Sequence, residues 1–205
     1  MARLGAQHQL ARAHACAMRA GCGWRARRRS RRRVGHLERL CLSGNEMSDD
    51  GAVAMAALLQ HKKCTLRDVS LESNGITGPG GLALGAAIGR NTSLASLNLS
   101  ENQCGVPAAA KALVAGLAAN KTLQELNLAW WSLGGGAFAA LARAAGAHPK
   151  LHRLDLSFND AGDAGARVFA AALERPGGCA LRKLHRALCV INDAHAAPAV
   201  SARDG

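Results

Sequence analysis

Apolar residues recur at a fixed spacing through the middle of the chain. Five nine-residue segments align without a gap, and their first residues are 29, 28, 29 and 28 positions apart. In each segment Leu stands at positions one, four and six and Asn at position nine, except where Val69 replaces a Leu and Trp131 an Asn. The segments are residues 37–45, 66–74, 94–102, 123–131 and 151–159. Such a period predicts a solenoid assembled from one repeated supersecondary unit.

Alternation within each segment predicts a short β-strand. Side chains point alternately to the two faces of a strand, so Leu97 and Leu99 should share the buried face. Ser96, Asn98 and Ser100 are then expected to face outward. Equivalent strands from successive repeats would lie side by side in one sheet.

Each strand segment is followed by a turn and an alanine-rich segment. In residues 51–59, 80–88, 137–145 and 165–173, apolar residues recur every three or four positions, which predicts helices. Residues four apart share one helix face, and the expected inward pairs are Met55/Leu59, Leu84/Ile88, Leu141/Ala145 and Phe169/Leu173. Small Ala residues at the other positions allow neighbouring helices to approach closely.

The alternation of these segments resembles the ribonuclease-inhibitor-like subfamily of leucine-rich repeat proteins over roughly residues 37–180. Families with this repeat type include ribonuclease inhibitors, the sensor regions of NOD-like receptors and Ran GTPase-activating proteins. The resemblance implies an α/β fold, a leucine-rich repeat solenoid shaped as a short horseshoe arc. Parallel β-strands would form its concave face and α-helices its convex face.

The Asn at position nine has a structural interpretation. An inward carboxamide can bond backbone groups of the turn that leaves the strand, and stacked copies make a ladder. The predicted ladder consists of Asn45, Asn74, Asn102 and Asn159. Trp131 interrupts it, and we expect its side chain to occupy the same inward position.

Both ends of the chain depart from the repeats. Residues 1–35 contain ten Arg and no acidic residue, which leaves 16 Lys and Arg against 14 Asp and Glu in residues 36–205. We divide the chain into a basic Arg-rich leader at 1–35, expected to be disordered, five leucine-rich repeats at 36–180, and a degenerate sixth repeat with a tail at 181–205. Because solenoids need polar end caps, we expect either a fragment of a longer repeat protein or an incorrect gene end.

The Arg-rich leader has three interpretations. Its content of Arg, Ala and Gly without acidic residues is typical of a mitochondrial or chloroplast transit peptide. The basic run at residues 25–33 also fits a nuclear localisation signal or an RNA-binding arm. The third alternative is a disordered or mistranslated tail, and the sequence does not separate the three.

The sequence contains no P-loop, nucleophile elbow, H-E-x-x-H or paired C-x-x-C motif. We therefore predict that the protein is not an enzyme and has no cofactor and no metal site. No apolar run reaches the ~18 residues of a membrane span, so no membrane partner is expected. Seven cysteines without tight pairing favour reduced thiols and a cytoplasmic location. The nucleus or an organelle is the alternative if the leader is a targeting signal.

Outward positions on the concave face, with the turn just after them, form the predicted partner-binding site. Stacking of the repeats makes Trp130 and Phe158 lateral neighbours, and exposed aromatic pairs are typical anchors of protein interfaces. Charged residues at nearby outward positions complete the site, which comprises Trp130, Phe158, Glu125, Arg153, Asp155 and Glu101.

The sequence thus predicts a non-catalytic protein–protein interaction module that binds an unknown protein through the concave face. Two alternatives stay open. One is GTPase activation of the Ran-directed type, although none of the residues of that activity can be matched in this chain. The other is RNA binding through residues 1–35, which predicts binding that falls steeply with salt.

Overall fold

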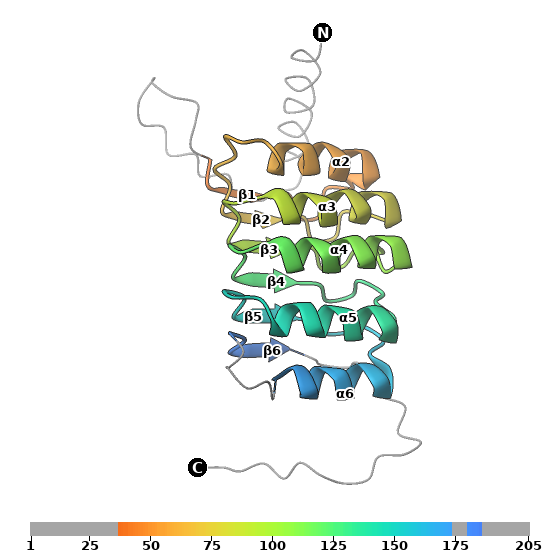
Figure 1. The fold of residues 1–205 in the computed structure, drawn as a ribbon. Coiled ribbons are helices and arrows are strands. Elements are labelled where there is room, and N and C mark those ends of the chain that lie inside the picture. The colour runs from red at the N-terminus through yellow and green to blue at the C-terminus, as the bar shows by residue number, and fades with distance from the viewer. Residues whose placement is uncertain (1–36, 174–179, 186–205) are drawn as a thin grey trace, which may run out of the picture.

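Strands and helices alternate along the chain as the repeat pattern predicts (Figure 1). The computed structural model describes residues 37–173 and 180–185. In these residues the elements are β1 Arg39–Cys41, α2 Ser48–Leu59, β2 Asp68–Ser70, α3 Gly78–Arg90, β3 Ser96–Asn98, α4 Pro107–Ala119, β4 Glu125–Asn127, α5 Gly135–Gly146, β5 Arg153–Asp155, α6 Gly162–Leu173 and β6 Lys183–His185.

The described strands form one parallel sheet in the order β1-β2-β3-β4-β5-β6. The register pairs equivalent residues of successive repeats, so that Leu97 lies opposite both Val69 and Leu126. The helices are stacked in the same order along one side of this sheet (Figure 1). The predicted α/β solenoid with an open parallel sheet is therefore confirmed.

The buried face of the strands follows the predicted alternation with one correction. Leu97 and Leu99 are each 1% exposed, as expected. Ser100, which we expected to face outward, is only 4% exposed. The strand ends at Asn98, whose Oδ1 accepts hydrogen bonds from the Ser100 amide at 3.0 Å and the Ser100 hydroxyl at 2.8 Å. The chain is already turning there, so twofold alternation no longer decides which side chain reaches solvent.

The helices bury the predicted inward side chains wherever these are described, and the burial of Leu173 stays a prediction because its side chain lies outside the described residues. The inward residues are no more than 5% exposed at Met55, Leu59, Leu84, Ile88, Leu141, Ala145 and Phe169. Helices α3 and α4 approach most closely where glycines of the two helices meet. A Cβ on Gly85 would lie 2.6 Å from the backbone nitrogen of Leu113, and one on Gly116 would collide with the carbonyl oxygen of Gly85. Only residues without side chains permit this separation.

The degenerate sixth copy keeps its strand, because Leu184 in β6 pairs with Leu154 in β5. The leader, residues 174–179 and residues 186–205 lie outside the described residues. The interpretations placed on them therefore stay predictions. In the part of the chain that is described, no helix is both long enough and apolar enough to cross a membrane.

Candidate partner-binding site

The turns after the first five strands contain residues in the left-handed backbone region. In each turn, one of them stands directly before position nine of the repeat. We call these residues the turn row, and their φ angles are 68° at Gly44, 52° at Ser73, 56° at Glu101, 57° at Trp130 and 59° at Phe158. Backbone hydrogen bonds join neighbouring turns. The amide of Glu101 donates to the carbonyl of Ala129 at 2.9 Å, and the amide of Trp130 donates to the carbonyl of Ser157 at 3.0 Å. The backbone hydrogen bonding between neighbouring repeats thus continues past the ends of the strands into the turn row.

Trp130 and Phe158 form a stacked aromatic pair within the turn row. Their ring centroids are 4.4 Å apart and their planes differ by 11°. Trp130 is 54% exposed, and Phe158 is half-buried. Aromatic pairs of this kind stabilise each other by about 0.5–1.5 kcal/mol beyond their buried area. One face of the Trp130 indole is therefore covered by Phe158, and much of the remaining side chain is open to solvent.

The backbone conformation of this pair is unfavourable for aromatic residues. A left-handed residue other than Gly costs roughly 1–2 kcal/mol, because its Cβ approaches the following carbonyl oxygen. Gly44 avoids this cost at the same position of the first repeat. Ser73 and Glu101 have the same conformation in their own repeats, so it belongs to the repeat turn. What distinguishes Trp130 and Phe158 is the stack of two aromatic rings at a position where part of the pair is open to solvent.

The charged residues of the predicted site fall into two groups. Glu101 lies beside Trp130 in the turn row, and Asp155 ends the strand that leads to Phe158. Glu125 and Arg153 pair with each other in the sheet register at the opposite end of β4 and β5. They precede the turn row by five residues, on the order of 15 Å along an extended chain. The structure thus places Glu101 beside Trp130 in the turn row and Asp155 three residues before Phe158, whereas Glu125 and Arg153 lie at the opposite end of the strands.

Glu125 and Asp155 also make contacts within the solenoid. The Oε1 atom of Glu125 lies 3.8 Å from Nε2 of His152. The Oδ1 atom of Asp155 accepts a hydrogen bond from the backbone amide of Ser157 at 3.0 Å. Asn127 occupies the place of Asp155 in the preceding repeat and bonds the amide of Ala129 at 3.0 Å. Asp155 therefore has a structural task in addition to any role in binding.

The ladder Asn residues connect each turn to the one before it. Oδ1 of Asn102 accepts hydrogen bonds from the amides of Asn74 at 3.2 Å and Ile76 at 3.0 Å. Its Nδ2 atom donates to the carbonyls of Leu71, Leu99 and Ser100 at 2.9–3.0 Å. The buried carboxamides of Asn74, Asn102 and Asn159 use both their donor and their acceptor atoms on backbone groups, as a buried amide requires.

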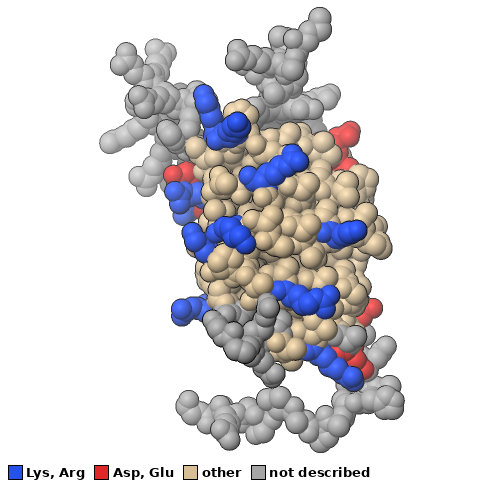
Figure 2. All heavy atoms as spheres, viewed as in Figure 1, with Lys and Arg blue, Asp and Glu red and all other residues tan. Residues whose placement is uncertain are grey.

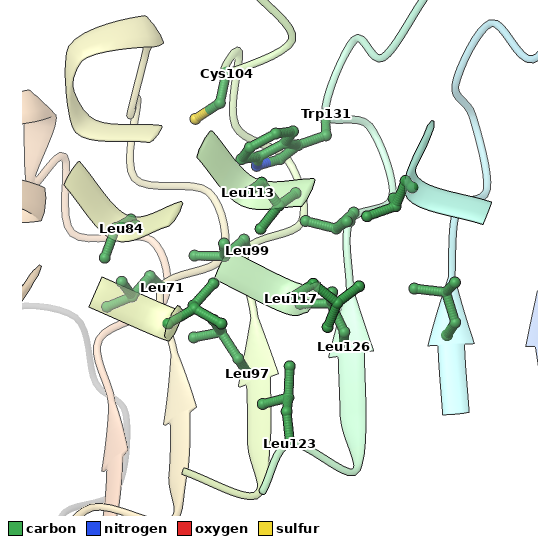
Figure 3. Packing of buried hydrophobic residues seen from close by; sticks show 14 of the residues in the cluster. Leu71, Leu84, Leu97, Leu99, Cys104, Leu113, Leu117, Leu123, Leu126 and Trp131 are labelled. Carbon is green, nitrogen blue, oxygen red and sulfur yellow. The ribbon is translucent and has the colours of Figure 1, made fainter. Parts of the chain in front are cut away.

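Trp131 stands where the ladder carboxamide of the fourth repeat would be. The side chain is 0% exposed and lies beside Cys104 and Leu113 in the core (Figure 3). In the preceding repeat, Oδ1 of Asn102 accepts hydrogen bonds from the amides of Asn74 and Ile76. The equivalent amides here are those of Asn102 and Cys104, and indole has no oxygen that could accept hydrogen bonds from them. Within the described residues, Trp131 Nε1 is itself buried without a hydrogen-bond partner. Packing of a large ring thus replaces hydrogen bonding in this repeat.

A second polar ladder, which our sequence interpretation missed, runs along the other end of the strands. Oδ1 of Asn91 accepts the amide of Leu94 at 2.7 Å, and Oδ1 of Asn120 accepts the amide of Leu123 at 2.8 Å. In the next repeat Nδ1 of His148 accepts the amide of Leu151 at 2.9 Å. The available signal was spacing, since each of these residues stands three positions before the first Leu of a repeat.

The His148 imidazole is 3% exposed, and its pKa is lowered from the ordinary value. Burial is the main cause, the charge of Lys121 adds to it, and the backbone of Asn120 acts in the opposite direction. A neutral ring is required at Nδ1, because that atom accepts the amides of Lys150 and Leu151. The lowered pKa is consistent with this structural use of histidine.

Charged side chains on the face shown in Figure 2 are dispersed. Lys and Arg are spread over it and separated by uncharged surface, without one dense basic patch. No group of three or more His, Cys, Asp or Glu residues is placed to hold a metal ion anywhere in residues 37–173 and 180–185.

Comparisons with known proteins agree with this architecture. The family model "Leucine Rich repeat" matches residues 36–56, 62–85 and 147–170. Human NACHT, LRR and PYD domains-containing protein 13 is 34% identical over 158 residues, which cover 76% of this chain and 14% of that protein. The pig ribonuclease inhibitor is 31% identical over 148 residues, which cover 72% of this chain and 32% of that protein.

A solved structure of Leiomodin-1 actin-binding site 2 has the same type of fold. It superposes with a TM-score of 0.56 and 20% sequence identity, and the match covers 67% of this chain and 79% of that one. The likeness concerns the fold alone.

The sheet, the stacked helices and the matched repeats define a leucine-rich repeat solenoid. The chain belongs to the leucine-rich repeat proteins and has repeats of the ribonuclease-inhibitor-like type, related to those of NACHT- and LRR-containing proteins and of the ribonuclease inhibitor. It spans about a seventh to a third of the length of these two relatives.

Proposed function

We propose that the chain is a non-catalytic module that binds a protein partner through the edge of its concave face, with Trp130 and Phe158 as the anchor. The observation that carries the proposal is the stacked aromatic pair, in which the Trp130 side chain is 54% exposed. Aromatic residues supply much of the binding energy at protein interfaces. The name of the pig relative, an inhibitor of ribonuclease, describes a protein that acts on another protein and supports the same class of function.

The sharpest test changes the pair without disturbing the backbone. Asn tolerates the left-handed conformation, so Trp130→Asn combined with Phe158→Asn removes both rings and keeps the turn. The full chain and this double variant are immobilised and incubated with cell lysate. Proteins retained by the full chain are quantified, and the best-retained candidate is purified for direct titration. We expect the double variant to bind it at least about 2 kcal/mol more weakly, about 30-fold in Kd.

Ser73→Asn is the matched control, because Ser73 occupies the same left-handed position two repeats before the pair. It should retain the partner as the unchanged chain does. Equal affinity of the double variant and the control for every purified candidate would contradict the proposed site. We also propose a cytoplasmic location for this interaction, while the role of the Arg-rich leader stays a prediction.

A further inference from the structure

We infer that the open face of the Trp130 indole and the Glu101 carboxylate together bind an arginine side chain of the protein partner. This inference rests on the proposed function and adds the chemistry of the group that is recognised. It depends on the order of residues in the turn row, on their exposure, and on the charges around them.

The turn row determines which side of the indole is open. Phe158 belongs to the following repeat and stacks nearly parallel to Trp130, at 4.4 Å. The opposite face of the indole is therefore directed toward the preceding repeat. Glu101 occupies the turn row there, with its amide hydrogen-bonded to the residue before Trp130 at 2.9 Å. Neighbouring strands lie about 4.8 Å apart, so the Glu101 backbone is one such step from that of Trp130.

Both groups are available to a ligand. Trp130 is 54% exposed, and Glu101 is also exposed. Among the described residues, the Glu101 side chain has no hydrogen-bond or ion-pair partner. By contrast, the nearby Glu72 carboxylate accepts a hydrogen bond from Asn98 at 3.0 Å. Glu101 is thus a carboxylate beside an aromatic face that nothing in the described chain neutralises.

The surrounding charges favour a cation. From the end of each strand to the turn row, the first five repeats contain three carboxylates and no Lys or Arg; the carboxylates are Glu72, Glu101 and Asp155. The basic residues of the sheet, such as Arg39 and Arg153, stand at the opposite end of the strands. This end of the concave face therefore carries a net negative charge that complements a positively charged group.

Arginine fits this arrangement better than lysine does. A planar guanidinium can lie flat on an indole face, where a cation–π contact forms within about 6 Å of the ring centroid. Its N–H fork can at the same time donate two hydrogen bonds to one carboxylate. The ammonium of lysine is more strongly hydrated and has no flat surface to stack. Trp130 would supply the stacking surface and Glu101 the charge.

The test follows the indole Nε1–H signal of Trp130 by NMR in the full chain. That signal is identified as the one missing from the Trp130→Asn variant. The probe is the blocked tripeptide Gly-Arg-Gly, and blocked Gly-citrulline-Gly is the neutral control of nearly the same shape. We expect a saturable shift with the arginine peptide at millimolar concentration and a much weaker shift with the citrulline peptide.

Glu101→Gln removes the charge and keeps the size of the side chain. We expect the substitution to weaken binding of the arginine peptide about threefold, because an exposed ion pair contributes about this much to affinity. Glu46→Gln is the matched control, because Glu46 is an exposed carboxylate at another left-handed position, in the first repeat. It should leave the affinity unchanged. Equal shifts with arginine and citrulline, or an unchanged affinity in Glu101→Gln, would overturn the inference.

The outcomes separate this inference from the proposed function. If Glu101→Gln has no effect but the Trp130–Phe158 double variant loses its protein partner, the arginine inference fails and the proposed binding site stands. If the double variant keeps its partner, the proposed binding site fails, whatever the tripeptide does.

Discussion

The turns of the third and fourth repeats have nearly the same backbone conformation but chemically different side chains. Glu101 and Trp130 share nearly the same φ, 56° and 57°, and each is followed by a buried residue. In the third repeat that residue is Asn102, which joins two turns by hydrogen bonds. In the fourth it is Trp131, which fills the core with a ring. The same turn conformation is thus stabilised by hydrogen bonds in the third repeat and by packing of a ring in the fourth.

The comparison also separates two uses of tryptophan. Trp131 is 0% exposed, whereas its neighbour Trp130 is 54% exposed and stacked on Phe158. Burial of a large ring stabilises a fold, while an exposed ring in a strained conformation does little for it. We therefore expect substitutions at Trp131 to affect the free energy of unfolding and substitutions at Trp130 to affect binding.

The largest effect is expected at Trp131. Trp131→Ala should lower the free energy of unfolding by about 3–5 kcal/mol, because it leaves a cavity in the core. Trp131→Asn should lower it by about 1 kcal/mol less, since a ladder carboxamide can accept the amides of Asn102 and Cys104. Urea denaturation of the two variants measures the difference. If Trp131→Asn is no more stable than Trp131→Ala, our interpretation that packing of Trp131 replaces the ladder hydrogen bonds is wrong.

The next largest effect is expected at Asn102. Asn102→Ala leaves buried backbone groups without the partners that the carboxamide supplies. We expect a loss of about 3 kcal/mol in the free energy of unfolding. Asn127→Ala is the control, because Asn127 is half-buried and bonds one backbone amide. That control should lose only about 1 kcal/mol, and equal losses in the two variants would contradict the ladder account.

Much of the fold follows from the sequence, because the spacing of Leu and Asn places them at equivalent positions of each repeat. The proposed binding site follows from the sequence only in part. Sequence predicted that Trp130 and Phe158 lie in one row, but not that both have positive φ, since a turn conformation is not determined by hydrophobic pattern. The sequence analysis grouped Glu125 and Arg153 with the aromatic pair because both are at outward positions. The pattern does not show that they lie at the other end of the strands from Trp130 and Phe158.

A smaller effect extends the comparison to the other end of the strands, where His148 continues the ladder of Asn91 and Asn120. Unfolded histidine binds a proton near pH 6.5, whereas burial lowers the pKa of His148 in the folded chain. The unfolded state then binds more protons, so the stabilisation present above that pH is lost as the pH falls below it. His148→Asn should make the free energy of unfolding less dependent on pH in this range.

The control for that measurement is His61→Asn, since His61 is exposed and follows the end of α2. Urea denaturation from pH 7.5 to 5 would be compared for the two variants and the unchanged chain. The same loss of stability with falling pH in His148→Asn and the unchanged chain would show that the buried imidazole does not cause it.

The most direct test of the central claim is the free energy of unfolding of the Trp130→Asn, Phe158→Asn double variant. The claim is that these rings serve binding and not the fold. Loss of the stack costs about 0.5–1.5 kcal/mol, and Asn offsets part of it because its short polar side chain adopts the left-handed conformation more readily. We predict a free energy of unfolding within about 1 kcal/mol of that of the unchanged chain. A loss of about 3 kcal/mol, as expected for the buried Trp131, would contradict the account.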